Sequence, residues 1–377
     1  MKVDLDGWVF TERELAEARA GNRLLNPSLD LGSACNLNCP YCFVESKNSA
    51  RKGRKPGELN RREIELVIDD CVSAGARTFN LVGSGEPTID PQFRDVVNRC
   101  HSAGARSVVF TNGIAISEDE TLVDFLWKSK ATIVLKFNAI TPLLQDSMVG
   151  KNGYSNIRDL ALERLMRCGF NATNPTRLAV DTLACRGNLD ELPLIHRWCR
   201  NNNVFPMTAE FIPTGRTSDG SVNQVAALKV IDADLASRAT ELLQPLSGGQ
   251  RCRLLAELVA IDREYGIEHQ GERAYFGGGR CTQLLGVYID IVGRIWACVA
   301  RSRGAGVDAL PLGSVRAGDK ASTVWRNEPY LKWIRSTYTG ACPYKRPMTA
   351  EGLYLEHGSA FIPLADLDAR PVSGLET

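Results

Sequence analysis

The 377-residue sequence has no long apolar run and almost no net charge. No stretch is long enough to span a bilayer, and the first residues, Met1–Asp6, lack the apolar core of a signal peptide. The 45 Lys and Arg residues nearly balance the 44 Asp and Glu residues, which argues against the basic face of a general nucleic-acid-binding protein. We therefore expect a cytoplasmic protein without a membrane or nucleic-acid partner.

Histidine is also scarce, and none of the 4 histidines forms a pair with metal-ligand spacing. The 12 cysteines are numerous by contrast, but a disulfide framework is not expected in the cytoplasm. Clustered cysteines are therefore interpreted as metal ligands, and scattered ones as core residues.

One cysteine cluster occupies the segment Cys35–Phe43, which reads CNLNCPYCF. Pro40 prevents a regular helix, and the spacing predicts a loop whose sulfurs converge on one compact object. Three thiolates leave one position of a four-coordinate metal open, and no fourth Cys or His lies nearby. A cubane iron-sulfur cluster fits this arrangement. Structural zinc, which takes four ligands, is the alternative.

Short β-rich runs alternate with amphipathic helical runs from about residue 27 onward. Six strands are predicted, at Ser28–Leu31, Thr78–Val82, Ser107–Thr111, Thr132–Asn138, Arg177–Leu183 and Val204–Ile212. The alternation favours a parallel sheet, and six units closing partway round a barrel place functional loops after the strands. The cysteine loop directly follows the first of these strands.

Capping boxes mark the starts of two predicted helices. Thr11 precedes the first helix, and Asn60 begins a helix over Asn60–Ala74 whose apolar residues share one face. This helix ends in CVSAGAR, and the next helix ends in the similar CHSAGAR. Cys71 and Cys100, which open these two copies, are therefore expected to be core thiols.

Polar motifs follow the second, third and fourth strands. Gly83–Pro87 reads GSGEP, in which glycines permit close backbone approach and a carboxylate can accept from a bound ammonium. Thr111–Gly113 (TNG) follows the third strand, and Lys136–Asn138 (KFN) ends the fourth. Lys136 could instead be an ordinary strand-end charge.

Two acidic residues, Asp181 and Glu210, lie on the fifth and sixth strands. A charge within an apolar strand is costly unless it is paired or faces a cavity. Asp181 and Glu210 are therefore candidate catalytic groups in a barrel interior, with a structural ion pair as the alternative. Arg216, after the sixth strand, is a further candidate.

The CX3CX2C loop, GSGEP and TNG, in this order after successive strands, resemble elements of radical S-adenosylmethionine (SAM) enzymes. The resemblance implies a [4Fe-4S] cluster on Cys35, Cys39 and Cys42 whose open iron binds SAM. It also implies cofactor contacts from Tyr41, Phe43, Gly83, Ser84, Gly85, Glu86, Thr111, Asn112, Lys136, Asn138 and Asn188. Ser84 replaces a glycine of the family pattern, and KFN stands where related enzymes often carry Ser-x-Asp.

A second cysteine set lies toward the C-terminus. Cys281, Gly293 and Cys298 are similar to the CX9-15GX4C element of SPASM and Twitch domains, which hold auxiliary iron-sulfur clusters. Cys342 follows where a Cys-x-x-Cys is expected, but Lys345 takes the last position. The resemblance implies an auxiliary [4Fe-4S] cluster on the three cysteines. Because a protonated ammonium cannot ligate iron, the expected protein ligand shell of this cluster is incomplete. An oxygen ligand or Cys252 could complete it, and Lys345 could hold substrate or a cluster-bound anion.

The expected fold is α/β, a partial (β/α)6 TIM-like radical SAM barrel with a small α+β Twitch- or SPASM-like C-terminal domain. The expected boundaries are a preface at 1–26, the barrel at 27–221, a helical bridge at 222–274, the auxiliary domain at 275–346 and a tail at 347–377.

The family implies an oxidoreductase that cleaves SAM to a 5'-deoxyadenosyl radical, with an external reductant such as flavodoxin or ferredoxin. The preface is too short for the leader-recognition domain of many peptide-modifying relatives. We therefore expect oxidation of a small polar metabolite, such as a sugar or aminocyclitol, with the auxiliary cluster accepting the second electron. Alternatives are peptide maturation, radical epimerisation with a thiol donor such as Cys252, and nucleotide cyclisation. A non-enzymatic electron carrier would have no need of the SAM motifs.

Overall fold

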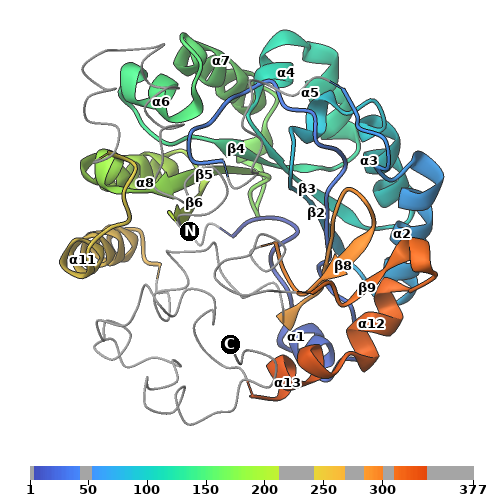
Figure 1. Cartoon of the computed structure of the whole chain (residues 1–377). Coiled ribbons are helices and arrows are strands. Elements are labelled where there is room, and N and C mark those ends of the chain that lie inside the picture. The colour runs from blue at the N-terminus through green and yellow to red at the C-terminus, as the bar shows by residue number, and fades with distance from the viewer. Residues whose placement is uncertain (1–3, 43–52, 212–241, 268–283, 300–309, 338–377) are drawn as a thin grey trace.

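The computed structural model describes residues 4–42, 53–211, 242–267, 284–299 and 310–337. Its centre is a nine-stranded sheet in the order β6-β5-β4-β3-β2-β1-β7-β8-β9 (Figure 1). Strands β1 to β6 pair in parallel. They are β1 (Ser28–Leu29), β2 (Thr78–Leu81), β3 (Arg106–Thr111), β4 (Thr132–Lys136), β5 (Leu178–Ala184) and β6 (Phe205–Glu210). All six predicted strands are therefore confirmed. In the described ranges the sheet remains open between β6 and β9.

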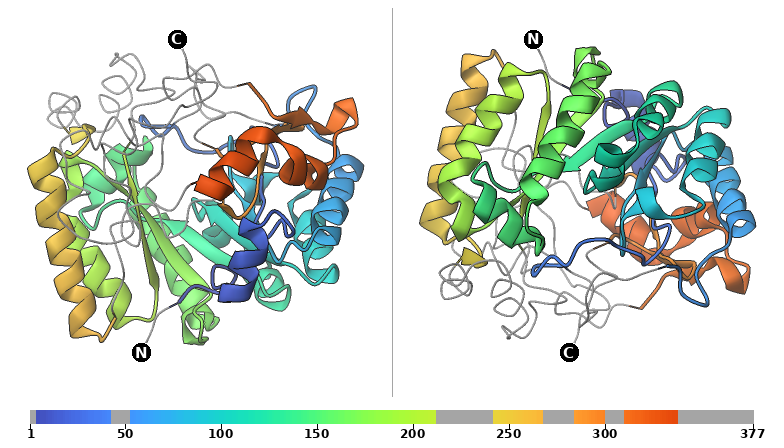
Figure 2. Two further views of the ribbon diagram at one scale, coloured as in Figure 1. Left: turned by 90° about the horizontal axis from the view of Figure 1, so that it is seen from below. Right: turned by 90° about the horizontal axis from the view of Figure 1, so that it is seen from above.

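Helices between the parallel strands form an outer layer in an arc around the sheet (Figure 2). They are α2 (Arg61–Ser73), α3 (Phe93–Ser102), α4 (Ile114–Glu118), α5 (Glu120–Lys128), α6 (Pro142–Val149), α7 (Tyr154–Arg167) and α8 (Leu192–Asn201). This strand-helix alternation confirms the predicted α/β architecture. None of the helices in the described ranges has the length and apolar character needed to cross a membrane.

Both predicted capping boxes are present. Thr11 caps α1 (Glu12–Arg19), and Asn60 caps α2 with its side chain accepting from the Glu63 N–H at 3.1 Å. Cys71 and Cys100 are fully buried in the main core, which confirms them as core thiols. The same core holds Phe79, where truncation to Ala would cost about 3–5 kcal/mol.

The C-terminal strands extend the barrel sheet. Strand β7 (Tyr288–Ile289) pairs in parallel with β1, and β8 (Arg294–Trp296) and β9 (Gly313–Ser314) follow in antiparallel pairing. Helices α12 (Ala321–Asn327) and α13 (Pro329–Thr337) come next. The N–H of Ser322 on α12 donates to Asp70 of α2 at 2.9 Å. The predicted hairpin and helix therefore exist; the hairpin pairs with the first barrel strand, and α12 contacts α2.

One more helix, α11 (Gly248–Glu264), packs outside α8 (Figure 2). Fully buried Asp262 accepts from Arg200 Nε at 2.6 Å and lies 2.6 Å from His196 Nε2. Burial by itself raises the pKa of Asp262, but hydrogen bonds from His196 and Arg200 outweigh it and lower the value to about 2. This ion pair fixes α11, which lies within the predicted bridge, to the barrel helices.

Candidate active site

The loops that follow the parallel strands meet at one edge of the sheet, which we call the carboxyl edge. The cysteine loop, Cys35–Cys42, follows β1, and Gly83–Pro87 follows β2. The TNG turn follows β3, and KFN crosses the end of β4. The sequence motifs are therefore brought to one place, as predicted.

Backbone contact holds the start of the cysteine loop against the loop after β2. The Glu86 N–H donates to the Ala34 carbonyl at 2.7 Å. A Cβ atom on Gly85 would lie 2.3 Å from the same carbonyl oxygen, so only glycine fits this position. Gly85 thus lets the loop after β2 pack closely against the backbone that directly precedes Cys35.

The thiols of the cysteine loop lie near one another. Cys35 and Cys39 pack against the apolar side chains of Leu37, Ile114, Val149 and Tyr154. Burial raises the pKa of Cys39, the neighbouring Cys42 and Cys35 act in the same direction, and the value reaches about 12. A thiol with this pKa is protonated at neutral pH, so assembly of a metal cluster on it would release protons.

The donor set fits a cubane cluster. The cysteine loop offers three free thiols that lie near one another, and thiolates are the ligands that hold iron-sulfur clusters. Cys35, Cys39 and Cys42 are the residues that would hold it.

A buried carboxylate, Asp30, supports the glycine-rich loop. Its Oδ2 accepts from the Ser84 N–H at 2.8 Å and from the Tyr288 hydroxyl at 2.9 Å. A Cβ on Gly83 would lie 2.2 Å from the Asp30 carboxyl carbon. Sequence reasoning missed Asp30 and Tyr288, although an acid at the end of an apolar strand was a usable signal. Tyr288 of β7 thus contacts Asp30, the carboxylate that holds the glycine-rich loop after β2.

The Glu86 carboxylate is used within the protein. Its Oε1 accepts from the Thr88 N–H at 3.1 Å, the Thr88 hydroxyl at 2.6 Å and the Thr111 hydroxyl at 2.7 Å. Its Oε2 accepts from the Asn112 N–H at 2.7 Å. Burial raises the pKa of Glu86, and these donors oppose the rise. The side chain therefore ties the loop after β2 to the loop after β3.

The TNG turn also contacts the cysteine loop. Asn112 Nδ2 donates to Asn36 Oδ1 at 2.7 Å, and the Tyr154 hydroxyl donates to the Asn112 carbonyl at 2.7 Å. Asn36 and Tyr154 were not predicted as site residues. Asn36 lies inside the cysteine motif, which was the available signal.

Lys136 and Asp181 form an ion pair across neighbouring strands. The sequence left two alternatives for Asp181, a catalytic group in a barrel interior or a member of a structural ion pair. The structure places Asp181 in an ion pair, and that pair faces the cysteine loop. The Lys136 ammonium lies 5.8 Å from the centre of the Tyr41 ring. Both side chains keep some exposure, 23% for Lys136 and 17% for Asp181.

Two amides hold the ends of β4 and β5. Asn138 Nδ2 donates to the Tyr41 hydroxyl at 2.7 Å, and its Oδ1 accepts from the Leu183 N–H at 3.0 Å. Asn188 Nδ2 donates to the carbonyls of Asn138 and Leu183, each at 2.7 Å. Burial raises the pKa of Tyr41 well above its usual value, so its hydroxyl stays protonated. Asn138 therefore positions the cysteine loop through Tyr41.

Several predicted site residues lie outside the described residues. They are Phe43, Arg216, Cys281, Cys342 and Lys345. Glu210 is placed at the end of β6, opposite Ala184 of β5, but its side chain is also outside the description.

Cys298 lies at the other edge of the sheet. Because β8 runs antiparallel to β7, and β7 is parallel to β1, the residues after β8 return to the edge where β1 begins. Cys298 follows β8 and is buried. Cys298 thus lies at the edge of the sheet opposite to the one that carries the cysteine loop.

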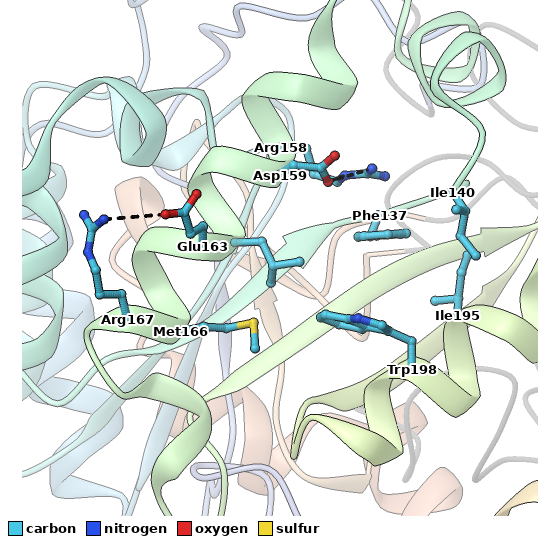
Figure 3. A pocket seen from close by; sticks show the side chains of 10 residues that line it. Phe137, Ile140, Arg158, Asp159, Glu163, Met166, Arg167, Ile195 and Trp198 are labelled. Atoms are coloured by element: carbon cyan, nitrogen blue, oxygen red, sulfur yellow. Dashed lines mark hydrogen bonds and ion pairs between the residues drawn. The ribbon is translucent and has the colours of Figure 1, made fainter.

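A ligand-sized pocket of about 570 Å³ lies between α7 and α8 (Figure 3). Phe137 and Trp198 line it with near-parallel rings whose centres are 6.2 Å apart. Side chains alternate along a strand, so Phe137 is directed away from the face used by Lys136 and Asn138. This pocket is therefore separate from the carboxyl-edge site.

Comparison with known proteins identifies related sequences and folds. The model of the Radical SAM superfamily matches residues 29–180, which include the three clustered cysteines, GSGEP, TNG and KFN. Mycofactocin maturase MftC of Mycobacterium ulcerans (strain Agy99) is 25% identical over 319 residues, covering 83% of this chain and 78% of its own length. A SAM-dependent nucleotide dehydratase of Flammeovirga pacifica is 22% identical over 179 residues, covering 46% of this chain and 58% of its own.

A similar fold occurs in the crystal structure of Streptococcus suis SuiB bound to the precursor peptide SuiA. The TM-score is 0.58 at 15% identity, with 96% of this chain and 77% of SuiB covered. The TM-score establishes a shared fold, and at this identity the similarity shows the fold alone.

Proposed function

This chain belongs to the radical SAM superfamily, and from that premise we propose that its carboxyl-edge site initiates radical chemistry. The family implies a [4Fe-4S] cluster and SAM as cofactors. Held by Cys35, Cys39 and Cys42, such a cluster would supply the one electron for reductive cleavage of SAM, and the resulting 5'-deoxyadenosyl radical would take a hydrogen atom from substrate. The observation that carries the proposal is the convergence of Cys35, Cys39 and Cys42 with the GSGEP and TNG loops.

The protein's own groups would bind and orient SAM. The Glu86 carboxylate already accepts four hydrogen bonds from the chain, so we assign SAM contact in this loop to backbone atoms. Asn112, Asn138 and Asn188 hold the loops in register, and Lys136 with Asp181 supplies charge beside the cysteine loop. Positioning of this kind brings the reacting atoms together and excludes water.

For the substrate, modification of a peptide is the function that the comparisons support best. MftC, a maturase, aligns with 83% of the chain, and SuiB shares the fold and binds a precursor peptide. These similarities count against the expectation of a small metabolite that the sequence favoured. They make a peptide side chain the first class of substrate to test.

Oxidation of a small polar metabolite is the second candidate. The similarity to a nucleotide dehydratase shows that relatives with small polar substrates exist, and a sugar or aminocyclitol belongs to that class. In either case the product of hydrogen abstraction is a substrate radical. A two-electron oxidation then needs an acceptor for the second electron.

An auxiliary cluster on Cys281, Cys298 and Cys342 is proposed as that acceptor. Its support is the spacing of these residues and the position of buried Cys298 at the sheet edge away from the cysteine loop. A substrate within the barrel would then lie between the radical source and the electron acceptor. Iron analysis should give about eight irons per chain for two cubanes. About four irons after full reconstitution would contradict the second cluster.

The initiating role of the cysteine loop is tested by SAM cleavage in anaerobically reconstituted protein with a strong reductant. Wild type should release 5'-deoxyadenosine, and Cys39→Ala should release none. Cys168→Ala is the matched control, because Cys168 is a partly buried thiol at the end of α7. Undiminished cleavage in Cys39→Ala, or S-adenosylhomocysteine as the main product, would refute the assignment.

The substrate class is tested by adding candidate substrates to the same assay. Peptides encoded beside the gene should raise 5'-deoxyadenosine formation and change mass. Coupled turnover of a sugar or aminocyclitol, with peptides inert, would favour the second candidate and reject the first.

A further inference from the structure

Lys136, the last residue of β4, pairs with Asp181 in the middle of β5, and the two lie directly opposite each other in the strand register. The Lys136 ammonium lies 5.8 Å from the centre of the Tyr41 ring, and Tyr41 stands between Cys39 and Cys42 in the chain. Asn138 fixes that ring by its 2.7 Å hydrogen bond to the hydroxyl. The position of the cation relative to the cysteine loop is therefore determined by the fold.

The Lys136 ammonium approaches the cysteine loop at the Tyr41 ring, 5.8 Å from its centre. Asp181 pairs with this ammonium, so a charge of each sign lies beside the loop. Both side chains are mostly shielded from solvent, so salt screens them less than surface charges.

We propose that Lys136 and Asp181 set the reduction potential of the cluster held by Cys35, Cys39 and Cys42. This inference rests on the proposed function. Reduction adds one electron from an external one-electron reductant, and no bond is made or broken. The reduced cluster carries one more negative charge, which the Lys136 ammonium stabilises and the Asp181 carboxylate disfavours.

The physical consequence is a pair of opposite effects. Removing the cation should make the cluster harder to reduce, because the added electron loses a positive charge beside the cysteine loop. Removing the anion should make the cluster easier to reduce, because Lys136 then acts without a counter-charge. A pair that only holds β4 to β5 would not produce opposite shifts.

The test is a redox titration of the reconstituted full chain. Reduction of the cluster is monitored through its EPR signal, the one that changes when SAM is added. At the wild-type midpoint potential, Lys136→Gln should lower the ratio of reduced to oxidised cluster about tenfold, which is about 59 mV for one electron. Asp181→Asn should raise the ratio. Lys136→Arg keeps the charge and should stay close to wild type. Lys128→Gln, an exposed lysine at the end of α5, should have no effect.

Shifts in the same direction for Lys136→Gln and Asp181→Asn, or no shift in either, would overturn the proposal. An unchanged potential with weakened SAM binding in Lys136→Gln would assign Lys136 to SAM contact instead. If Lys136→Gln fails to load a cluster, the Asp181→Asn and Lys136→Arg results still decide the question. Failure of wild type itself to cleave SAM would refute the proposed function, and is distinguishable from failure of this inference.

Discussion

The two halves of the carboxyl edge use their polar groups differently. After β1, β2 and β3, the buried carboxylates of Asp30 and Glu86 accept hydrogen bonds from neighbouring loops. After β4 and β5, the amides of Asn138 and Asn188 form the cross-links. There the charged groups, Lys136 and Asp181, remain partly exposed beside the cysteine loop.

This difference shows that a charged residue of a predicted binding motif can also hold neighbouring loops together. The Glu86 carboxylate of GSGEP serves as a cross-link, because its oxygens are taken up by Thr88, Thr111 and Asn112. In the second half, neutral amides take over the cross-linking. The formal charges of Lys136 and Asp181 are then available to act on a cofactor.

The largest effect is expected for Glu86→Ala. The change leaves buried donors of Thr88, Thr111 and Asn112 without an acceptor, so the free energy of unfolding should fall by about 3 kcal/mol. SAM binding should weaken as well, because the loops after β2 and β3 separate. Urea unfolding and anaerobic calorimetry measure the two effects. Glu120→Ala, at an exposed carboxylate on α5, is the control, and equal losses in both variants would contradict the cross-link.

A smaller effect is expected for the amides. Asn138→Ala and Asn188→Ala should each lower the free energy of unfolding by about 2 kcal/mol. Their effects should not add, because Asn188 donates to the Asn138 carbonyl. Only Asn138→Ala should reduce the iron content after reconstitution, since only Asn138 holds Tyr41. Equal iron loss in both variants would contradict the role of Tyr41.

The pH dependence of stability should separate Glu86 from the amides. Burial raises the pKa of Glu86 in the folded state, whereas in the unfolded chain a Glu titrates near about 4.3. Between these values the folded state binds more protons, so stability falls as the pH rises through this window. Relative to Glu86→Gln, wild type should therefore lose stability as the pH rises from about 4.3 through the raised folded-state pKa of Glu86. If wild type instead gained stability relative to Glu86→Gln over this range, the pKa of Glu86 in the folded state would not be raised.

The smallest change in stability is expected for the charged pair. A partly exposed ion pair contributes little, so Lys136→Gln should lower the free energy of unfolding by less than about 1 kcal/mol. The same variant should still shift the cluster potential. A loss comparable to that of Glu86→Ala would place Lys136 among the structural cross-links and remove the contrast between the two halves.

The sequence predicted those parts of the fold that depend on local patterns. Six strands were found from their periodicity, and the helix that begins after Asn60 was found from its capping box. Cys71 and Cys100 were assigned to the core because they end amphipathic helices. These signals are local, so they can be read without knowledge of the tertiary structure.

The remaining features depend on contacts between distant residues. The hydrogen bond from Tyr288 to Asp30 joins residues 258 positions apart, and the pairing of β7 with β1 has no local signal. The sequence allowed Asp181 to be either a member of an ion pair or an unpaired group in a cavity. Only the strand register, which places Lys136 opposite Asp181, decides for the ion pair. The use of Glu86 as a cross-link likewise appears only when the loops are seen together.

The most direct measurement is the EPR spectrum of the reduced, reconstituted protein before and after addition of SAM. If Cys35, Cys39 and Cys42 hold a cluster with an open iron at the carboxyl edge, SAM should alter the spectrum of wild type and of Cys168→Ala. The altered signal should be absent from Cys39→Ala. A fully reduced wild-type cluster whose spectrum does not respond to SAM would contradict the account.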